Sequence, residues 1–243
     1  MTAPRRTARL EHRLTQPNAS LTDLHAAIPL VLEHGLAALA VNPWLVRPAA
    51  RSLARSPVSV ATVIGFPHGA QAAAVKAFEA SMALEHGASQ LDFVLNAGAL
   101  VSGDDEAVLN DMLAVVEMAQ SALATCGVIV PVGLLGEELV RRACRLAARA
   151  GVDHVTTSIG DEPAEATVEW VRRLRRVGDE ELPVKAAGSF TDVAQVASAI
   201  AAGAVCISTV FGPELAAAAS ALLAETAPAR TEPTLADVGA AAG

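Results

Sequence analysis

The sequence predicts a (β/α)8 TIM barrel, an α/β fold in a single domain. Short apolar runs typical of strands alternate eight times with longer amphipathic segments typical of helices, and the connections between them are short. This order implies parallel strands joined by right-handed crossovers. The length of 243 residues also suits a closed barrel, which usually needs about 250. A doubly wound open sheet is the alternative, but no Gly-x-Gly-x-x-Gly motif follows the first strand.

The predicted strands are residues 9–13, 37–42, 58–64, 90–95, 127–132, 154–158, 183–187 and 205–209. The predicted helices are residues 21–34, 48–54, 71–86, 105–125, 137–150, 162–177, 191–202 and 213–226. Ser20 precedes the first helix and an acid, Asp23, lies in its first turn, which is typical of a capped N-terminus. Four segments end at a glycine, the usual C-terminal stop: Gly35, Gly87, Gly151 and Gly203.

The chain divides into a barrel of residues 1–226 and a flexible C-terminal tail of residues 227–243, which is polar and broken by prolines. The basic N-terminus continues into Leu-Glu-His-Arg rather than an apolar segment, unlike a secretory signal. No apolar stretch reaches the roughly 18 residues of a membrane span. We therefore expect a cytoplasmic protein that does not interact with membranes.

Composition excludes several classes of protein. A hydrophobic content of 52% excludes disorder of the whole chain. The net charge of -8 argues against a nucleic-acid partner, and three cysteines without paired spacing exclude a disulfide scaffold or a cysteine-based zinc module. The chain has no tyrosine and only two lysines, Lys76 and Lys185. Glu79 follows Lys76 by three residues, which favours a solvated ion pair on a helix.

Two charged residues stand in apolar runs at predicted strand ends, where the working residues of a barrel lie. Asp92 lies within Gln-Leu-Asp-Phe-Val, and Lys185 lies within Pro-Val-Lys-Ala-Ala. A desolvated carboxylate titrates abnormally unless it is paired, and a desolvated lysine is a candidate base or Schiff-base amine. The two residues can meet across the barrel mouth, either as a structural ion pair or as catalytic groups.

Small and hydroxyl residues end the last three predicted strands. Backbone N–H groups in such turns can approach an anion closely, and barrels often bind phosphate there. The sequence therefore predicts a phosphate site; its candidate residues are Thr156, Ser158, Gly160, Gly188, Ser189 and Ser208. Further candidates are Glu11 and His12 on the first strand, Asn42 after the second and His68 after the third. The remaining histidines, His154 among them, show no metal-ligand spacing.

Several motifs in order resemble the deoxyribose-phosphate aldolase family. They are Thr-Val-Ile-Gly-Phe-Pro-His-Gly-Ala at 62–70, Lys-Ala-Phe-Glu at 76–79, Gly-Ala-Ser-Gln-Leu-Asp-Phe-Val-Leu-Asn at 87–96, Thr-Ser-Ile-Gly at 157–160 and Val-Lys-Ala-Ala-Gly at 184–188. The resemblance implies a class I aldolase barrel of carbohydrate catabolism that needs no metal or organic cofactor. Such a lyase cleaves 2-deoxyribose 5-phosphate into acetaldehyde and glyceraldehyde 3-phosphate.

The resemblance places Asp92 at the family's proton-shuttling aspartate and Lys185 at its second lysine. It also assigns phosphate-binding positions to Gly160, Gly188, Ser189 and Ser208. The position of the Schiff-base lysine, however, is occupied by Thr156, which cannot form an imine.

Further departures lie on the first and fifth strands. Glu11 replaces the family's aspartate, and Gly127 and Pro131 replace a lysine and a glutamate.

Three functions remain open from the sequence. The first is a carbon–carbon lyase of the aldolase type acting on a small phosphorylated aldehyde or sugar, with Lys185 as the nucleophile and Asp92 as the proton relay. The second is an isomerase or dehydratase that uses acid–base chemistry on a small phosphorylated substrate without an imine. The third is a catalytically inactive barrel that binds a sugar phosphate. A homodimer is the assembly considered.

Overall fold

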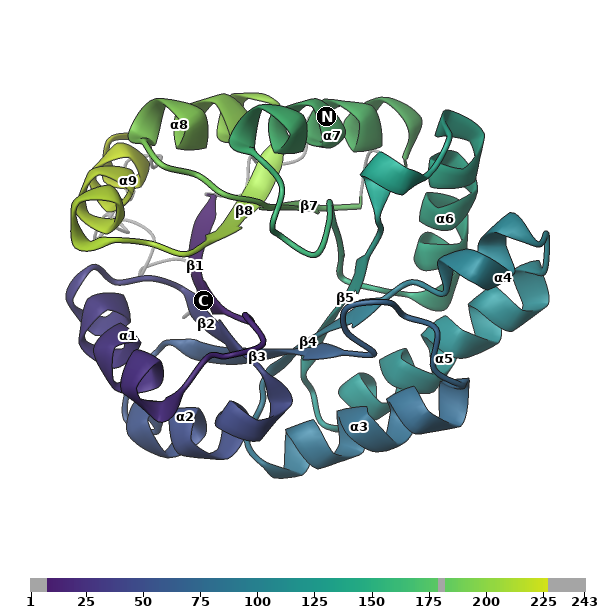
Figure 1. The fold of residues 1–243 in the computed structure, drawn as a ribbon, viewed down its shortest axis with the longest axis horizontal. Coiled ribbons are helices and arrows are strands. Elements are labelled where there is room, and N and C mark those ends of the chain that lie inside the picture. Colours follow the sequence, from purple (N-terminus) through teal and green to yellow (C-terminus); the bar gives the residue numbers. More distant parts are fainter. Residues whose placement is uncertain (1–7, 179–181, 227–243) are drawn as a thin grey trace, which may run out of the picture.

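A computed structural model describes residues 8–178 and 182–226. Eight parallel strands follow one another in chain order and close into a barrel, because β8 pairs with β1 (Figure 1). This closure confirms the predicted barrel and excludes the open sheet. The strands are β1 Arg9–Leu14, β2 Ala38–Val41, β3 Ser59–Ile64, β4 Gln90–Val94, β5 Thr125–Ile129, β6 His154–Thr156, β7 Val184–Ala187 and β8 Ala204–Thr209.

Helices surround the barrel as an outer ring (Figure 1). They are α1 Leu21–Glu33, α2 Val46–Leu53, α3 Ala73–Glu85, α4 Ala97–Val101, α5 Asp105–Ser121, α6 Glu137–Ala150, α7 Ala164–Val177, α8 Val193–Ala201 and α9 Pro213–Thr226, with 3-10 turns η1 Pro43–Leu45 and η2 Val132–Leu134. The short elements α4, η1 and η2 were not predicted, since each is too brief to show a helical period.

The predicted helix signals are confirmed. The Ser20 hydroxyl accepts a hydrogen bond from the Asp23 backbone N–H, and the Asp23 carboxylate accepts one from the Ser20 backbone N–H, which forms a capping box. All four predicted stop glycines have positive φ; Gly151, for example, has a φ of 78° at the end of α6.

The region around β5 corrects the prediction. The helix expected to reach residue 125 ends at Ser121, and Leu123 turns the chain with a φ of 55°. The strand expected over 127–132 is Thr125–Ile129, and η2 follows it. The apolar run misled the prediction because Val130 and Val132 are buried without belonging to the strand.

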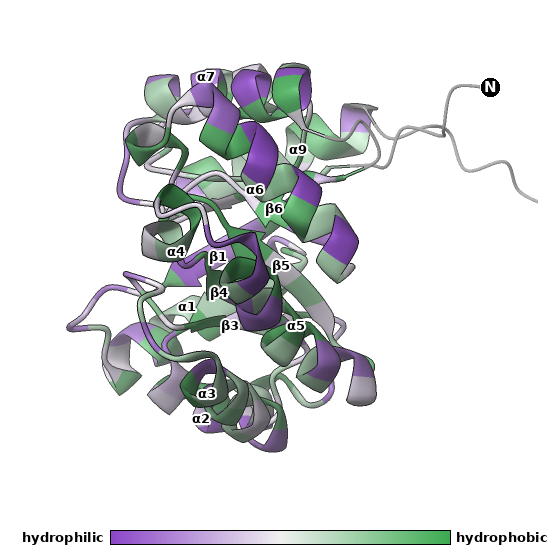
Figure 2. Cartoon of the chain, turned by 90° about the vertical axis from the view of Figure 1, so that its right-hand side faces the viewer, coloured by the Kyte–Doolittle hydropathy of each residue, from purple (hydrophilic) through white to green (hydrophobic). Residues whose placement is uncertain are grey.

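The main hydrophobic core lies between the outer face of the barrel and the inner faces of the helices. The helices are amphipathic, as this position requires; along α7, for example, hydrophobic and hydrophilic residues alternate in Figure 2. A second, smaller cluster is formed by Val63, Val94 and Ile129, with Phe66 and Ile159 packed against it. Since strand side chains alternate between faces, the positions that do not face the helices are free to form a site inside the barrel.

Lys76 is not the solvated helix residue that was predicted. Its side chain is fully buried, and Nζ lies 2.6 Å from Asp111 Oδ2 and 2.9 Å from the Val94 carbonyl oxygen. Glu79 accepts a hydrogen bond from the Gly65 backbone instead. The prediction was wrong because α3 packs against α5, which supplies the carboxylate; spacing along one helix does not reveal such a partner.

The predicted tail, residues 227–243, lies outside the described residues. Among residues 8–178 and 182–226, no helix is long and apolar enough to cross a membrane.

Candidate active site

A pocket at the barrel mouth brings together half of the predicted site residues. Its lining includes Glu11, Asp92, Thr156, Ser158, Lys185 and Ser208, which come from five different strands and the loop after β6. One side of the lining is apolar, with Val63, Ile129, Phe66 and Ile159. The pocket thus pairs a polar wall with an apolar one.

Lys185 is the centre of the polar wall. Its Nζ lies 2.8 Å from Glu11 Oε2 and 2.8 Å from Asp92 Oδ2, and all three side chains are buried. Gln90 links the two carboxylates, because its amide nitrogen donates to Glu11 at 3.0 Å and to Asp92 at 3.1 Å. The predicted meeting of Asp92 and Lys185 is therefore observed, with Glu11 as a second carboxylate.

His154 extends this network on the other side of Asp92. Its Nε2 lies 2.6 Å from Asp92 Oδ1, and the ring is buried. The space for the ring comes from Gly127 on the neighbouring strand β5, since a Cβ atom at that position would overlap the imidazole. Asp92 thus has a basic group at each carboxylate oxygen.

These contacts set the charges of the network. Burial opposes the charge of Asp92, but the Lys185 ammonium and His154 outweigh it and hold the pKa of that carboxyl well below its usual range. Burial alone would lower the pKa of Lys185, but attraction to Asp92 and Glu11 outweighs it and raises the pKa above its ordinary value. The resting site therefore holds an ammonium against two carboxylates.

Thr156, at the position where the resembled family has its Schiff-base lysine, pairs with Lys185 across strands β6 and β7. Its Oγ1 is buried and has no hydrogen-bond partner among the described residues. Thr156 thus offers the pocket an unused hydroxyl group close to the base of the Lys185 side chain.

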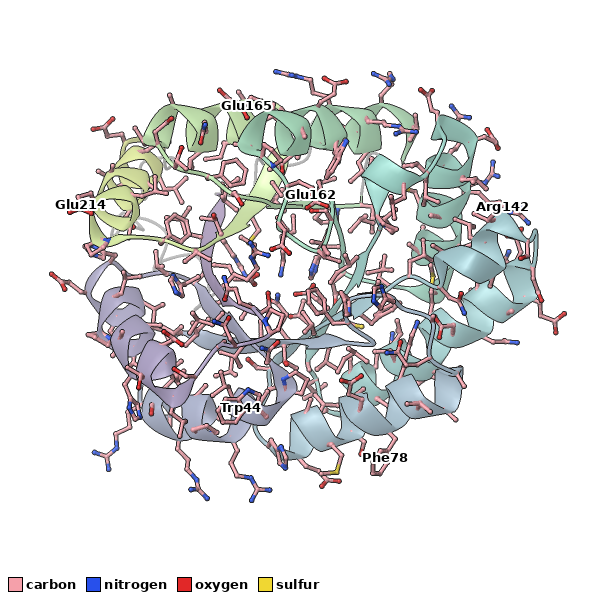
Figure 3. All side chains as sticks on the ribbon, viewed as in Figure 1. Trp44, Phe78, Arg142, Glu162, Glu165 and Glu214 are labelled. Atoms are coloured by element: carbon pink, nitrogen blue, oxygen red, sulfur yellow. The ribbon has the colours of Figure 1, made fainter. Side chains whose placement is uncertain are left out.

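Half of the predicted phosphate residues line the pocket, namely Thr156, Ser158 and Ser208. The other half, Gly160, Gly188 and Ser189, are absent from the lining, and their amides are already engaged. Gly160 N–H donates to Ser158 Oγ at 3.0 Å, Gly188 N–H to the Ser208 carbonyl at 3.2 Å, and Ser189 N–H to the Glu162 carbonyl at 2.8 Å. The Ser158 hydroxyl donates to Glu162 Oε2 at 2.6 Å. Figure 3 shows Glu162 at the edge of the barrel mouth, whereas Trp44, Phe78 and Glu165 lie on the outer ring.

Three weaker candidates lie outside the pocket lining. Asn42 donates to the Gln16 carbonyl at 2.8 Å, and His68 is exposed on the loop after β3. His12 accepts a hydrogen bond from the Phe211 backbone at 3.2 Å, and burial together with Arg13 lowers its pKa to about 4. Among the described residues, no three His, Cys, Asp or Glu side chains are grouped so as to hold a metal ion.

Comparison with known proteins identifies the family of this barrel. Residues 7–207 match the family described as "DeoC/LacD family aldolase". The chain belongs to the DeoC/LacD aldolase family.

Relatives of this DeoC/LacD aldolase include proteins named deoxyribose-phosphate aldolase. The one from Geobacillus sp. (strain WCH70) is 39% identical over 203 residues, which covers 84% of this chain and 91% of the relative. The one from Thermococcus kodakarensis is 43% identical over 202 residues, or 82% and 90%.

Solved structures agree with this assignment. An aldolase called QR15 has a TM-score of 0.79 and 30% identity over 93% of this chain and 99% of its own. A tetrameric deoxyribose phosphate aldolase from Aeropyrum pernix has a TM-score of 0.77 and 26% identity over 91% of each chain.

Two residues of this DeoC/LacD aldolase site were missed from the sequence. His154 precedes Thr156 by two residues, and Arg13 follows Glu11 by two residues. Because strand side chains repeat on one face every second residue, each shares the inward face of a predicted site residue. This spacing of two residues is the sequence signal that could have identified His154 and Arg13 as site residues.

Proposed function

We propose that this aldolase is an aldehyde-lyase of the deoxyribose-phosphate aldolase type. It cleaves 2-deoxyribose 5-phosphate, or a related phosphorylated sugar, into acetaldehyde and glyceraldehyde 3-phosphate or their counterparts. The observation that carries the proposal is a lysine amine, Lys185, buried in the barrel mouth between two carboxylates. Membership of the DeoC/LacD family supports the reaction class, and the two relatives above carry the name of this activity.

The resting ammonium of Lys185 must lose a proton before it can attack a carbonyl carbon. Asp92 and Glu11 are both within hydrogen-bond distance of Nζ, so either carboxylate can accept that proton. The amine then adds to the substrate carbonyl to form a carbinolamine. The same carboxylic acid returns its proton to the departing oxygen, water leaves, and an iminium forms on Lys185.

The hydroxyl group on the carbon that becomes the aldehyde then gives its proton to the Asp92 carboxylate. The carbon–carbon bond breaks, its electron pair stays on the nitrogen-linked fragment as an enamine, and the other fragment departs as an aldehyde. Protonation of the enamine carbon and hydrolysis with one water release acetaldehyde and restore the lysine. We assign the proton transfers of these steps to Asp92, backed by His154 at its second oxygen. We assign the Thr156 hydroxyl to binding of a substrate oxygen, because Oγ1 has no hydrogen-bond partner within residues 8–178 and 182–226.

A second candidate is acid–base chemistry without an imine, as in an isomerase or dehydratase on a phosphorylated substrate. It is favoured by the raised pKa of Lys185, which keeps the ammonium charged and able to polarise a carbonyl as a hydrogen-bond donor.

One assay separates the two candidates. We expect turnover of 2-deoxyribose 5-phosphate by the unmodified protein, and its loss in both Lys185→Met and Lys185→Arg, because a guanidinium cannot form the imine. Partial activity in Lys185→Arg would contradict the imine route and favour the second candidate. Stabilisation by sugar phosphates without any turnover would contradict both and indicate a binding protein.

A further inference from the structure

Arg13 crosses the barrel mouth from one side to the other. It lies on β1, and its guanidinium reaches the loop after β6, where Nη1 donates to the Ile159 carbonyl at 2.9 Å and Nη2 to the Gly160 carbonyl. Its side chain is only 8% exposed and lines the same pocket as Lys185. A buried cation therefore stands over the pocket.

The charge of Arg13 is poorly compensated. Two of its partners are neutral carbonyls, and its ion pair with Asp161 spans 3.4 Å to a side chain that is 76% exposed. The Nε atom is buried and has no hydrogen-bond partner among the described residues. Burial lowers the pKa of Arg13, and attraction to Asp161, Glu11 and Glu162 offsets this only in part. Buried charges in proteins are normally paired with a buried partner, whereas the anion that pairs with this guanidinium, Asp161, is largely exposed.

The nearby carboxylates are already engaged. Glu11 binds Lys185 and Gln90, and Glu162 accepts a hydrogen bond from Ser158. The charge of Lys185 is matched by Glu11 and Asp92, so that lysine does not leave an anion site of its own.

The backbone amides of the predicted phosphate turns are not free either. The amides of Gly160, Gly188 and Ser189 all donate to partners within the protein. Arg13 therefore lines the pocket with a charged donor, Nε–H, that has no hydrogen-bond partner among the described residues, whereas those amides are already engaged.

We propose that Arg13 determines substrate specificity by binding a phosphoryl oxygen of the substrate through its guanidinium. The identification of the anion as the phosphate of a sugar substrate rests on the proposed function. The binding of an oxyanion at Arg13 does not depend on that function. Guanidinium groups suit phosphate because their planar N–H donors match its oxygens and stay charged. The phosphate would then sit at Arg13 while the carbonyl reaches Lys185.

The test compares Arg13→Met with the unmodified protein in binding of inorganic phosphate, measured by calorimetry without turnover. We expect the dissociation constant to rise about 10- to 100-fold, the loss associated with one charge-assisted contact. In kinetics, KM for 2-deoxyribose 5-phosphate should rise by a similar factor.

Matched variants keep the result interpretable. Arg172→Met removes an arginine that is 57% exposed on α7 and should bind phosphate as the unmodified protein does. Arg13→Gln keeps donors for the loop carbonyls without the charge, so it should lose phosphate binding even if Arg13→Met does not fold.

Two results would overturn the proposal: no phosphate binding by the unmodified protein, or equal binding by the Arg13 variants. Phosphate binding that depends on Arg13, with no turnover of 2-deoxyribose 5-phosphate, would uphold it and refute only the proposed function.

Discussion

Replacing Lys185 by Met leaves Glu11 and Asp92 buried without their shared cation. Each carboxylate has an oxygen 2.8 Å from Nζ, and the side chains of both are nearly inaccessible to solvent. Breaking a buried ion pair from one side costs about 3–5 kcal/mol, because the remaining charge stays desolvated. In a domain of this size the loss corresponds to a Tm lower by about 6–20 °C.

The pH dependence of this loss has a definite sign. Without the Lys185 ammonium, only His154 still opposes burial at Asp92, so the pKa of this carboxyl is higher than in the unmodified protein and the variant gains stability relative to the unmodified protein as pH falls and protons bind. In the unmodified protein the pKa of Asp92 is lowered, so the stability that its carboxylate contributes is fully present above pH ~4 and is lost only as pH falls below that value. The stability gap, meaning the difference in free energy of unfolding between the unmodified protein and Lys185→Met, should therefore shrink as pH falls from 7 to 5.

Urea unfolding followed by fluorescence of Trp44 and Trp170 measures the gap at each pH. A double variant, Asp92→Asn with Lys185→Met, removes one of the two unpaired charges and should recover part of the loss. Arg172→Met serves as the control and should change stability by less than about 0.5 kcal/mol. Equal stability of Lys185→Met and the unmodified protein, or a gap that widens on acidification, would refute the reasoning.

Two further predictions concern the surroundings of this network. Gly127→Ala should destabilise the protein by about 1–3 kcal/mol, because the added methyl group overlaps the His154 ring. Gly136→Ala is the control and should not destabilise the protein, because a Cβ atom there meets nothing within 4 Å. Equal effects of the two substitutions would refute the role of Gly127. His12→Gln keeps an acceptor for the Phe211 amide but does not titrate. The pKa of His12 is lowered to about 4, so its contribution to the stability of the fold is complete above pH 6.5 and is lost as pH falls towards 4. Over this range the free energy of unfolding of the unmodified protein should therefore fall by up to about 3 kcal/mol relative to the variant. Parallel pH curves in urea unfolding would contradict the second prediction.

The barrel was predictable because each of its units carries local signals. Each signal spans only a few neighbouring residues: an apolar run, a cap such as that of Ser20 and Asp23, or a glycine that ends a helix. The errors lie where tertiary contacts decide, as at Lys76, whose partner Asp111 is 35 positions away on another helix.

The site was predictable only in part for the same reason. Asp92 and Lys185 stood out because charges in apolar strands are costly. The ring of His154 and the missing side chain of Gly127 become related only when β5 and β6 pair, and Arg13 reveals its role only where it meets the loop after β6.

The most direct test of the account is to reduce the protein with borohydride in the presence of 2-deoxyribose 5-phosphate or acetaldehyde and to map the modified peptide by mass spectrometry. The chain has two lysines, so Lys76, buried against Asp111, is an internal control. The account predicts an adduct on Lys185, none on Lys76, and none in Lys185→Met. Turnover of the substrate without an adduct on Lys185 would contradict it.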